Sequence, residues 1–226
     1  MGIKVKDDLF ARVRRSMVER LLVQRGITDK GVIDAMLTVP RHLFVEEGLY
    51  SQAYTDYPLP IGEKQTISQP YMVAFMTEAL GLTGSERVLE VGAGSGYQSA
   101  VLSLLCDKVY AVERVSVLAA RARRLLDHLH CSNVVVKFGD GTLGWEDEAP
   151  FDAIIVAAAS LSVPPAYVEQ LKNGGRLVMP VGPEGAQRLV RVTRRFGAST
   201  TEDLGECRFV KLIGKWGWEA RIKASC

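Results

Sequence analysis

What this 226-residue sequence lacks already excludes several classes of protein. No apolar run approaches the roughly 18 residues that a membrane-spanning helix needs. The four cysteines form no C-x-x-C pair and no metal-ligand spacing, a pattern that argues against a metal site and suits a reducing compartment. The formal net charge is only +2, so nothing in the composition favours nucleic acid as a partner. His42, His128 and His130 offer neither a catalytic triad nor a metal cluster.

The first ten residues, MGIKVKDDLF, carry no recognisable targeting signal. They lack the apolar core of a signal peptide, and Lys6 stands where an N-myristoylation signal has Ser or Thr. We interpret Cys106 and Cys131 as small hydrophobic residues of the core. Because the sequence shows no targeting signal and no membrane-spanning run, we expect a soluble, cytoplasmic protein without membrane attachment. No feature of the sequence encodes an oligomeric state, so a monomer is the default expectation.

The feature around which the rest is organised is the stretch RVLEVGAGSGY. Arg87–Val91 is apolar enough for a strand that is buried on both faces, and Tyr97–Leu105 is long and apolar enough for a helix. Between them Gly92, Gly94 and Gly96 alternate with other residues. A strand, a glycine turn and a helix are how an open parallel sheet begins a nucleotide-binding site, because glycine lets the backbone turn sharply against a ligand.

The glycine spacing narrows the range of possible ligands. A dinucleotide fingerprint would need its third glycine at Tyr97, and a phosphate loop would need the absent G-K-[ST]. The pattern E-x-G-x-G-x-G, with Glu90 as its acid, resembles the S-adenosylmethionine loop of Rossmann-like methyltransferases. An acidic residue there would face a cationic amino acid end and would repel a pyrophosphate. The alternative is a tight turn that binds no ligand.

The segments after the glycine loop alternate between strand and helix signals. We predict strands over 108–112, 134–138, 152–157 and 176–181, and helices over 115–130 and 166–171, the second of them ended by Gly174 and Gly175. This alternation requires a doubly wound, mostly parallel α/β sheet. Arg188–Arg194 and Arg208–Ile213 have no helix between them, so we expect both to be antiparallel edge strands at the C-terminal end.

The N-terminal third differs from this pattern. We predict a helix that Asp7 or Asp8 caps and Gly26 stops, and a second helix that follows Thr28 and runs until Pro40. Together they form a helical cap. Residues 41–69 show no periodicity, and long loops of this kind are usually functional. The next predicted helix is Pro70–Leu80, with proline in its first turn.

These elements suit one domain spanning residues 1–226, because 47% hydrophobic residues can build a substantial core. Within it we expect residues 1–70 to form the cap and a substrate loop, residues 71–181 the cofactor-binding core, and residues 182–226 the C-terminal strands.

Ligands of a parallel sheet bind outside the carboxyl ends of its strands. Glu113 ends the second predicted strand, about twenty residues past the glycine loop, where a carboxylate can accept bonds from ribose hydroxyls. Asp140 and Gly141 follow the third strand and suit the edge of an adenine, although Asp-Gly is also a common turn. The fourth strand ends in Ala157–Ala159 rather than in a polar-Pro-Pro-aromatic motif, which argues against methylation of base amino groups.

A second segment, PLPIGEKQTISQPYM over Pro58–Met72, is more specific than the glycine loop. Together with PRHLFV (Pro40–Val45) and LEVGAGSGYQ (Leu89–Gln98), it resembles the protein-L-isoaspartate (D-aspartate) O-methyltransferase family. The resemblance extends roughly over Met17–Val181 and includes FDAIIVAAA and LKNGGRLVMPVG. It implies the fold of a Rossmann-like class I methyltransferase.

The resemblance also implies the reaction. S-adenosylmethionine would donate its methyl group to the free carboxylate of L-isoaspartyl, and possibly D-aspartyl, residues in damaged proteins, leaving S-adenosylhomocysteine. The methyl ester would then close to a succinimide whose hydrolysis restores some aspartate. A carboxylate with a pKa near 4 is already ionised at neutral pH, so the reaction needs neither a strong base nor a metal.

Site residues follow from the same resemblance. Ser68, the last residue of the TIS triplet, would be the active-site residue and would orient the substrate carboxylate with a hydrogen bond. Local sequence alone favours a different role for Ser68, as a cap of the following helix, and both roles are compatible. The implied cofactor contacts are Thr66, Ile67, Ser68, Glu90, Gly92, Gly94, Glu113, Asp140 and Gly141.

Two positions depart from the family pattern. Lys64 replaces a glycine that is often present between the IG and QTIS pieces, and Lys211 replaces a proline after a similar F-V pair. Two other functions therefore stay open from sequence alone. The chain could be another class I methyltransferase acting on a small molecule or RNA, or a non-catalytic binding module with the same fold.

Overall fold

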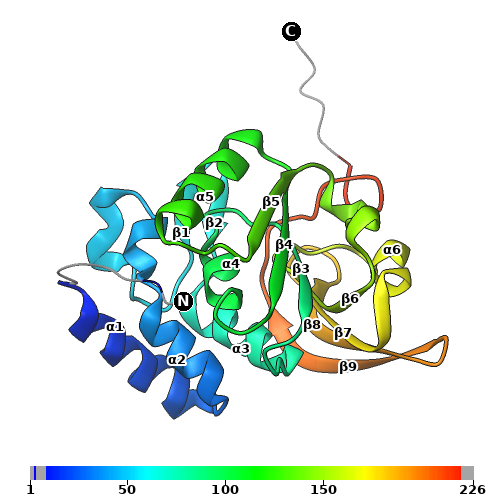
Figure 1. The fold of residues 1–226 in the computed structure, drawn as a ribbon, viewed down its shortest axis with the longest axis horizontal. Coiled ribbons are helices and arrows are strands. Elements are labelled where there is room, and N and C mark those ends of the chain that lie inside the picture. Colours follow the sequence, from blue (N-terminus) through cyan, green and yellow to red (C-terminus); the bar gives the residue numbers. More distant parts are fainter. Residues whose placement is uncertain (1–2, 4–8, 220–226) are drawn as a thin grey trace, which may run out of the picture.

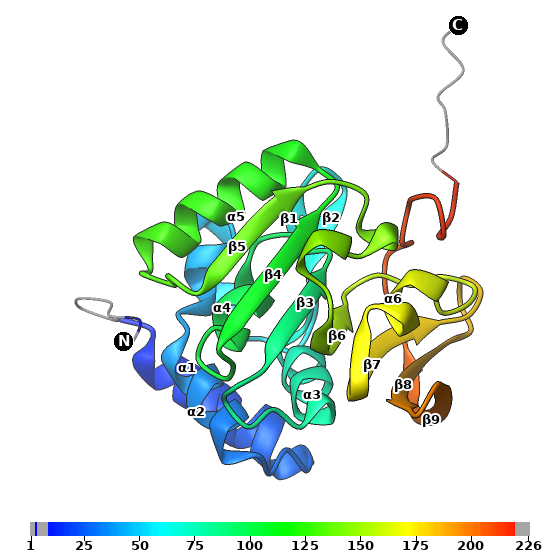
Figure 2. The same cartoon turned by 45° about the vertical axis from the view of Figure 1, so that its right-hand side comes forward.

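The computed structural model describes residue 3 and residues 9–219, and it centres on one seven-stranded sheet (Figures 1 and 2). The strand order is β5-β4-β3-β6-β7-β8-β9. The strands are β3 (Arg87–Val91), β4 (Lys108–Glu113), β5 (Val134–Phe138), β6 (Phe151–Val156), β7 (Leu171–Val181), β8 (Gln187–Arg195) and β9 (Ala198–Cys207). The first five run parallel, whereas β8 and β9 are antiparallel to their neighbours. The predicted mostly parallel sheet with antiparallel C-terminal edge strands is confirmed.

Strand β3 lies in the middle of the sheet because the chain winds first to one side of it and then to the other. From β3 it continues to β4 and β5, and it then crosses to β6 and β7 on the opposite side. Strand order therefore reverses at β3, and the loop after Val91 faces the crevice that this reversal creates. All of β3 except Arg87 is buried, as its apolar sequence predicts.

Helices cover both faces of the sheet. Residues of α3, α4 and α5 share the buried clusters of one face, whereas Tyr167 of α6 packs against Leu89 and Val91 on the other. The α-helices are α1 (Ala11–Met17), α2 (Lys30–Thr38), α3 (Pro70–Leu80), α4 (Tyr97–Leu102), α5 (Ser116–His128) and α6 (Pro165–Glu169). In the described part of the chain, every helix is too short or too polar to cross a membrane.

The helical cap lies beside the sheet, as predicted (Figure 1). Helix α1 continues through a π-helical turn and a 3-10 turn to Arg25, and Gly26 ends it with a φ of 96°. The predicted caps Asp7 and Asp8 lie outside the described residues. Asp29 caps α2, because its carboxylate accepts the Val32 N–H at 2.9 Å.

The segment 41–69 is more regular than its sequence suggests. It contains two short 3-10 helices, Arg41–Phe44 and Glu47–Gln52, and a hairpin of β1 (Leu59–Gly62) and β2 (Gln65–Ile67). The hairpin escapes sequence prediction because its strands are very short and a proline, Pro60, interrupts the first. Its turn residues, Glu63 and Lys64, have φ of 51° and 57°, a conformation that usually calls for glycine or asparagine.

Two predictions near the C-terminus are wrong. Gly174 and Gly175 do not end α6, which ends at Glu169; both glycines lie inside β7, where the register against β6 shifts. The last strand is not Arg208–Ile213 but β9, whose polar, exposed sequence gives little strand signal. Residues 208–213 instead cross the sheet end, where Lys211 forms an isolated bridge with Ala159.

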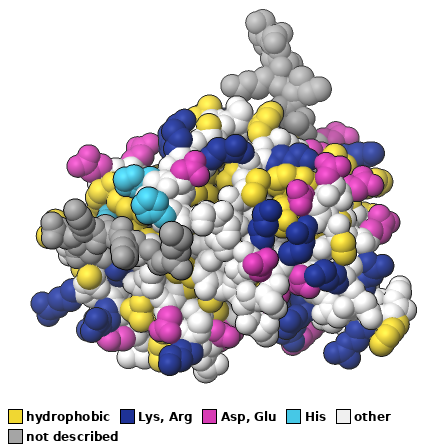
Figure 3. All heavy atoms as spheres, viewed as in Figure 1, with side chains coloured by type: hydrophobic (Ala, Val, Ile, Leu, Met, Phe, Trp, Pro, Cys, Tyr) yellow, Lys and Arg dark blue, Asp and Glu magenta, His cyan; other side chains and the backbone are white. Residues whose placement is uncertain are grey.

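The face visible in Figure 3 carries basic and acidic side chains interspersed with each other. This distribution agrees with the low net charge of +2. The division of the chain at residues 70 and 181 stays a prediction, since β7 and β8 continue one sheet across the second of these boundaries.

Candidate functional site

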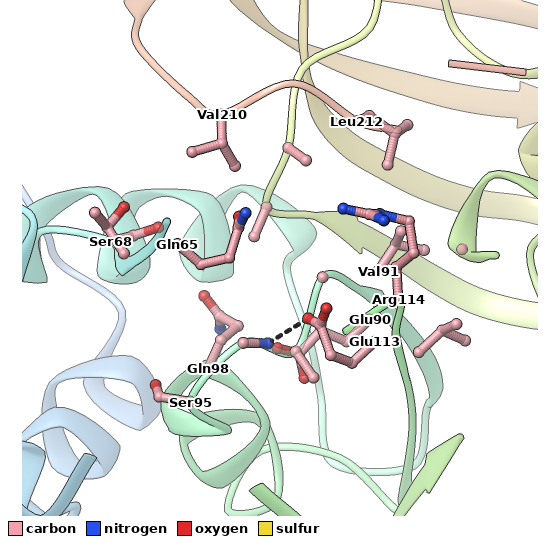
Figure 4. A pocket seen from close by; sticks show the side chains of 18 of the residues that line it. Gln65, Ser68, Glu90, Val91, Ser95, Gln98, Glu113, Arg114, Val210 and Leu212 are labelled. Atoms are coloured by element: carbon pink, nitrogen blue, oxygen red, sulfur yellow. Dashed lines mark hydrogen bonds between the residues drawn. The ribbon is translucent and has the colours of Figure 1, made fainter. Parts of the chain in front are cut away.

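A cavity lies at the carboxyl ends of β3, β4 and β6 (Figure 4). Its floor is the glycine loop, and the hairpin strand β2 forms one wall. The segment after β9 forms part of the opposite wall. Eight of the nine predicted cofactor contacts line this cavity, and the exception is Asp140. The residues brought together are Thr66, Ile67, Ser68, Glu90, Gly92, Gly94, Glu113 and Gly141.

The glycine loop is shaped by backbone conformation. Gly92 and Gly94 have φ of 87° and 53°, which other residues adopt only with strain. The Gly92 N–H donates to the Val112 carbonyl at 2.8 Å, so the loop is tied to the neighbouring strand β4. A Cβ on Gly94 would lie 3.3 Å from Ile61 Cδ1 of the hairpin. The loop and the hairpin are therefore close neighbours around the cavity.

Glu90 is a fully buried carboxyl group at the end of β3. Its Oε2 accepts the Ser99 hydroxyl at 2.5 Å, whereas its Oε1 is buried without a hydrogen-bond partner. Burial raises the pKa of Glu90 to about 7; the Ser99 bond lowers it, and the nearby Glu113 raises it further. A buried acceptor without a donor is unfavourable. A cationic group bound in the cavity would supply the missing donor and favour the ionised carboxylate.

Glu113 lies at the end of β4, in the position predicted for a ribose contact, and is only 6% exposed. Its Oε2 accepts the Gly94 N–H at 2.8 Å (Figure 4), and its Oε1 accepts the Val115 N–H at 2.8 Å. Each carboxylate oxygen can accept a second bond. The side chain is thus held in place by the backbone while one acceptor position on each oxygen is left for a ligand.

Asp140 and Gly141 differ in their relation to the cavity. Gly141 lines it and has no room for a side chain, since a Cβ would lie 2.5 Å from Val91 Cγ1. Asp140 forms the Asx turn that was the alternative interpretation, because its Oδ1 accepts the N–H and the hydroxyl of Thr142 at 2.9 and 2.7 Å. Its Oδ2 accepts the Lys215 N–H at 2.8 Å. The carboxylate of Asp140 therefore keeps only limited acceptor capacity for a ligand.

The TIS triplet forms the wall nearest to helix α3. Ile67 is buried, Ser68 is half-buried and Thr66 is exposed. The expectation that Ser68 caps α3 is wrong, because the N-cap residue is Gln69 and no side-chain hydrogen bond caps the helix. The backbone carbonyl of Ser68 accepts Nη2 of Arg41 at 2.8 Å. The side chain of Ser68 lines the cavity (Figure 4).

Several lining residues escaped sequence prediction. Gln65 and Gln98 face the cavity from β2 and α4, and Arg114 extends from the end of β4 toward Gln65 (Figure 4). Arg114 could have been found from its position directly after Glu113. Val210–Ile213 belong to the segment that was predicted as an edge strand, and they reach the cavity because a backbone bridge with Ala159 holds this segment across the sheet end.

The two departures from the family pattern differ in their relation to the cavity: Lys211 lines it, whereas Lys64 does not. Lys64 is exposed in the hairpin turn and does not line the cavity. The Nζ of Lys211 pairs with Glu184 Oε2 at 2.6 Å and lies 4.7 Å from the centre of the Trp218 ring. The bridge beside Lys211 uses the Val210 carbonyl and the Leu212 N–H, each 2.8 Å from Ala159, so it does not need an N–H at position 211.

The donor set of the cavity suits an organic cation better than a metal. It presents two acidic side chains, Glu90 and Glu113, and no histidine or cysteine. Among residues 9–219, His, Cys, Asp and Glu nowhere gather in a group of three that could hold a metal ion. The buried Oε1 of Glu90, the ordered carboxylate of Glu113 and the small Gly141 fit the ammonium, ribose and adenine parts of S-adenosylmethionine.

Comparison with known proteins gives a consistent result. A sequence model of the family described as Protein-L-isoaspartate(D-aspartate) O-methyltransferase (PCMT) matches residues 12–217. The protein-L-isoaspartate O-methyltransferase of Syntrophotalea carbinolica is 60% identical over 210 residues, which cover 92% of this chain and 97% of the relative. The protein of the same name from Geobacter metallireducens is 59% identical over 210 residues, with the same coverages of 92% and 97%.

Solved structures share the fold. A protein-L-isoaspartate O-methyltransferase superposes with a TM-score of 0.82 and 30% identity, covering 90% of this chain and 67% of the other. A Plasmodium falciparum structure named as a beta-aspartate methyltransferase (PCMT) gives a TM-score of 0.79 and 27% identity, covering 88% of this chain and 98% of the other. That structure is a complex with S-adenosyl-L-homocysteine.

Proposed function

Because the chain belongs to the protein-L-isoaspartate (D-aspartate) O-methyltransferase family, we propose that its cavity aligns a methyl donor with the carboxylate of an isoaspartyl residue. The chain is an S-adenosylmethionine-dependent methyltransferase that acts on isoaspartyl residues of proteins. The observation that carries the assignment of the cavity is the buried, unpartnered Oε1 of Glu90 beside the glycine loop.

Four residues of this chain would hold the amino acid end and the ribose of the donor. Glu90 would accept the ammonium group of its amino acid end, because that contact satisfies Oε1 and offsets the desolvation of the carboxylate. Glu113 would accept the ribose hydroxyls with the acceptor positions that its backbone bonds leave. Gly92 and Gly94 would let the backbone approach the ligand closely. When bound, S-adenosylmethionine supplies an electrophilic methyl group on a sulfonium.

Asp140 has the weakest support among the proposed contacts. Its carboxylate already accepts three hydrogen bonds and does not line the cavity, whereas the neighbouring Gly141 does. We therefore place the adenine against Gly141, with Asp140 fixing the turn that presents it. Thr66 and Ile67 would contact the donor from the hairpin side.

Ser68 would orient the acceptor. An isoaspartyl carboxylate is ionised at neutral pH, so attack on the methyl group needs alignment rather than a base. The Ser68 side chain lines the cavity and caps no helix, which leaves its hydroxyl free to donate to a carboxylate oxygen. A hydrogen bond to a charged group contributes about 1.5 to 3 kcal/mol.

The test is methyl transfer to matched peptides that contain isoaspartate, aspartate or D-aspartate at one position. We expect transfer to the isoaspartyl peptide, slower transfer to the D-aspartyl peptide and none to the aspartyl peptide. Equal rates on the isoaspartyl and aspartyl peptides, or no transfer to either, would contradict the proposed function.

Ser68→Ala tests the assigned role. It should lower kcat/KM about 10- to 100-fold, the loss expected for one charge-assisted hydrogen bond, and lower the affinity for S-adenosylhomocysteine less than that. Ser85→Ala, at an exposed serine before β3, serves as the control and should behave like the wild type. If Ser68→Ala and Ser85→Ala transfer methyl groups equally fast, Ser68 does not orient the acceptor.

A further inference from the structure

Arg41 is the largest fully buried side chain outside the cavity, with 0% of its surface exposed. It begins the 3-10 helix Arg41–Phe44, within the stretch PRHLFV (Pro40–Val45). Arginine is among the residues least often buried completely, because its guanidinium must be taken out of water. Its position therefore calls for an explanation.

The guanidinium of Arg41 joins three separate segments. Its Nε donates to the Ala53 carbonyl at 2.7 Å, and its Nη2 donates to the Ser68 carbonyl at 2.8 Å. Its central carbon lies 4.8 Å from the centre of the Tyr97 ring. Tyr97 is the first residue of α4 and directly follows the glycine loop. One side chain thus connects the segment that carries Ser68 to the helix that begins after the donor loop.

The charge of Arg41 is not neutralised by an ion pair within the described residues. Nη1 is buried without a hydrogen-bond partner. The Asp56 carboxylate raises the pKa of Arg41 less than Tyr97 and Tyr54 do, and its oxygens accept bonds from Arg25 and from the Tyr71 N–H. Burial lowers the pKa of Arg41, yet an arginine stays protonated in proteins. An unpaired buried cation lowers stability, so fold stability alone does not account for it.

We propose that Arg41 is a positioning residue for methyl transfer, which fixes the backbone of Ser68 relative to the glycine loop. This inference rests on the role proposed for Ser68. The Ser68 carbonyl belongs to the same residue whose hydroxyl would orient the acceptor, so a shift of that carbonyl also displaces the hydroxyl. The positive charge behind Ser68 additionally favours a carboxylate on the cavity side.

The shape of the side chain is part of the proposal. A guanidinium presents several N–H donors in a rigid, planar fork and can stack on an aromatic ring. Lysine would keep the charge but place it at one point, and it could not hold the carbonyls of Ala53 and Ser68 together while stacking on Tyr97. Arg41→Lys therefore removes the positioning and retains the cation.

The chain offers a matched control in Arg14. This arginine is also buried, at 8% exposure, and its Nε donates to the Leu37 carbonyl in the same helical cap. It does not line the cavity. Arg14→Lys should lower stability as Arg41→Lys does. Only Arg41→Lys should lower kcat/KM for the isoaspartyl peptide, by about 100-fold, the loss that a 1 Å misplacement can cause. Both variants should bind S-adenosylhomocysteine as the wild type does.

Hydrogen exchange measured by mass spectrometry provides a readout that does not depend on transfer. Arg41→Lys should speed exchange in peptides that cover residues 65–69, and Arg14→Lys should not. If the wild type fails to methylate isoaspartyl peptides, this measurement still decides whether Arg41 holds the Ser68 segment, so the two proposals fail separately.

Three results would overturn the inference: full activity of Arg41→Lys, unchanged exchange over residues 65–69, or parallel loss of activity and S-adenosylhomocysteine affinity in both variants. If Arg41→Lys does not fold, chemical rescue of Arg41→Ala tests the inference instead. Added guanidinium ion should restore methyl transfer by Arg41→Ala. Urea, which has the same shape but no charge, should not restore it. Equal rescue by both, or rescue by neither, would also overturn the inference.

Discussion

Replacing Glu90 by glutamine should make the ligand-free protein more stable at pH 8 and should stabilise it much less at pH 5. Glu90 is fully buried, and burial raises its pKa from the ordinary value of 4.5 to about 7. The folded state therefore holds a proton that the unfolded chain has already released at pH 5 to 7. Stability that depends on this proton is present at low pH and is lost as the pH rises through about 7.

The size of the effect follows from the same values. The gap between 4.5 and about 7 corresponds to about 3 kcal/mol when both states are ionised. Part of this difference is already present at pH 5, so about 2 to 3 kcal/mol should develop between pH 5 and pH 8. Glutamine has nearly the same shape and can still accept the Ser99 hydroxyl, but it has no charge to desolvate.

The assay is urea unfolding of the wild type and Glu90→Gln at several values between pH 5 and pH 8.5, without cofactor. The difference in unfolding free energy should grow with pH in favour of the variant. Glu86→Gln is the control: burial opposes ionisation there, but hydrogen bonds from Thr83 and Gly84 prevail and lower its pKa. The stability that Glu86 contributes is present above its unfolded pKa, so its loss should not vary over this range. A constant difference for Glu90→Gln as well would refute the argument from burial.

Three further predictions concern the loops around the cavity. In the wild type, the affinity for S-adenosylhomocysteine should increase as the pH rises to about 7, the pKa of Glu90, because the ionised carboxylate attracts the ammonium group of the ligand. Calorimetry should find no such pH dependence in Glu90→Gln. Gly141→Ala should lower the unfolding free energy by about 1 to 3 kcal/mol, because the added Cβ would lie 2.5 Å from Val91 Cγ1. Gly139→Ala is the control and should be neutral, because a Cβ there has nothing within 4 Å. Equal melting temperatures of the two variants would contradict the predicted clash. Lys64→Gly should raise the unfolding free energy by about 0.5 to 1 kcal/mol without altering methyl transfer, because Lys64 has a φ of 57° and glycine adopts this conformation without strain. A lower unfolding free energy of the variant would contradict the backbone strain at Lys64.

Sequence prediction succeeded where a glycine or proline marks the end of an element. Three elements were predicted to the residue, namely Arg87–Val91, Pro70–Leu80 and Val134–Phe138, and each has such a residue at one end. It failed where a strand is stabilised by its neighbour rather than by its own composition. The polar strand β9 and the short hairpin β1–β2 are of this kind, and pairing with a partner supplies their stability.

Asp140 shows how far the sequence can predict the role of a single site residue. Its position after the third strand correctly suggested proximity to the cavity, but the sequence could not show that the Lys215 N–H, 75 positions away, takes one of its oxygens. Ser68 shows the converse. Its local sequence favoured a helix cap, and the tertiary arrangement left its side chain in the cavity wall instead.

The sequence by itself determined the parallel sheet, the glycine loop, the cofactor class and, through QTISQP, the family. These depend on residues close together in the chain, whose spacing defines the local geometry. The tertiary structure alone decided that Glu90 is buried with one unpartnered oxygen, that residues 210–213 form part of the cavity wall, and that Arg41 reaches the Ser68 carbonyl. Desolvation and contacts between distant segments arise only when the chain is folded, so no local pattern could encode them.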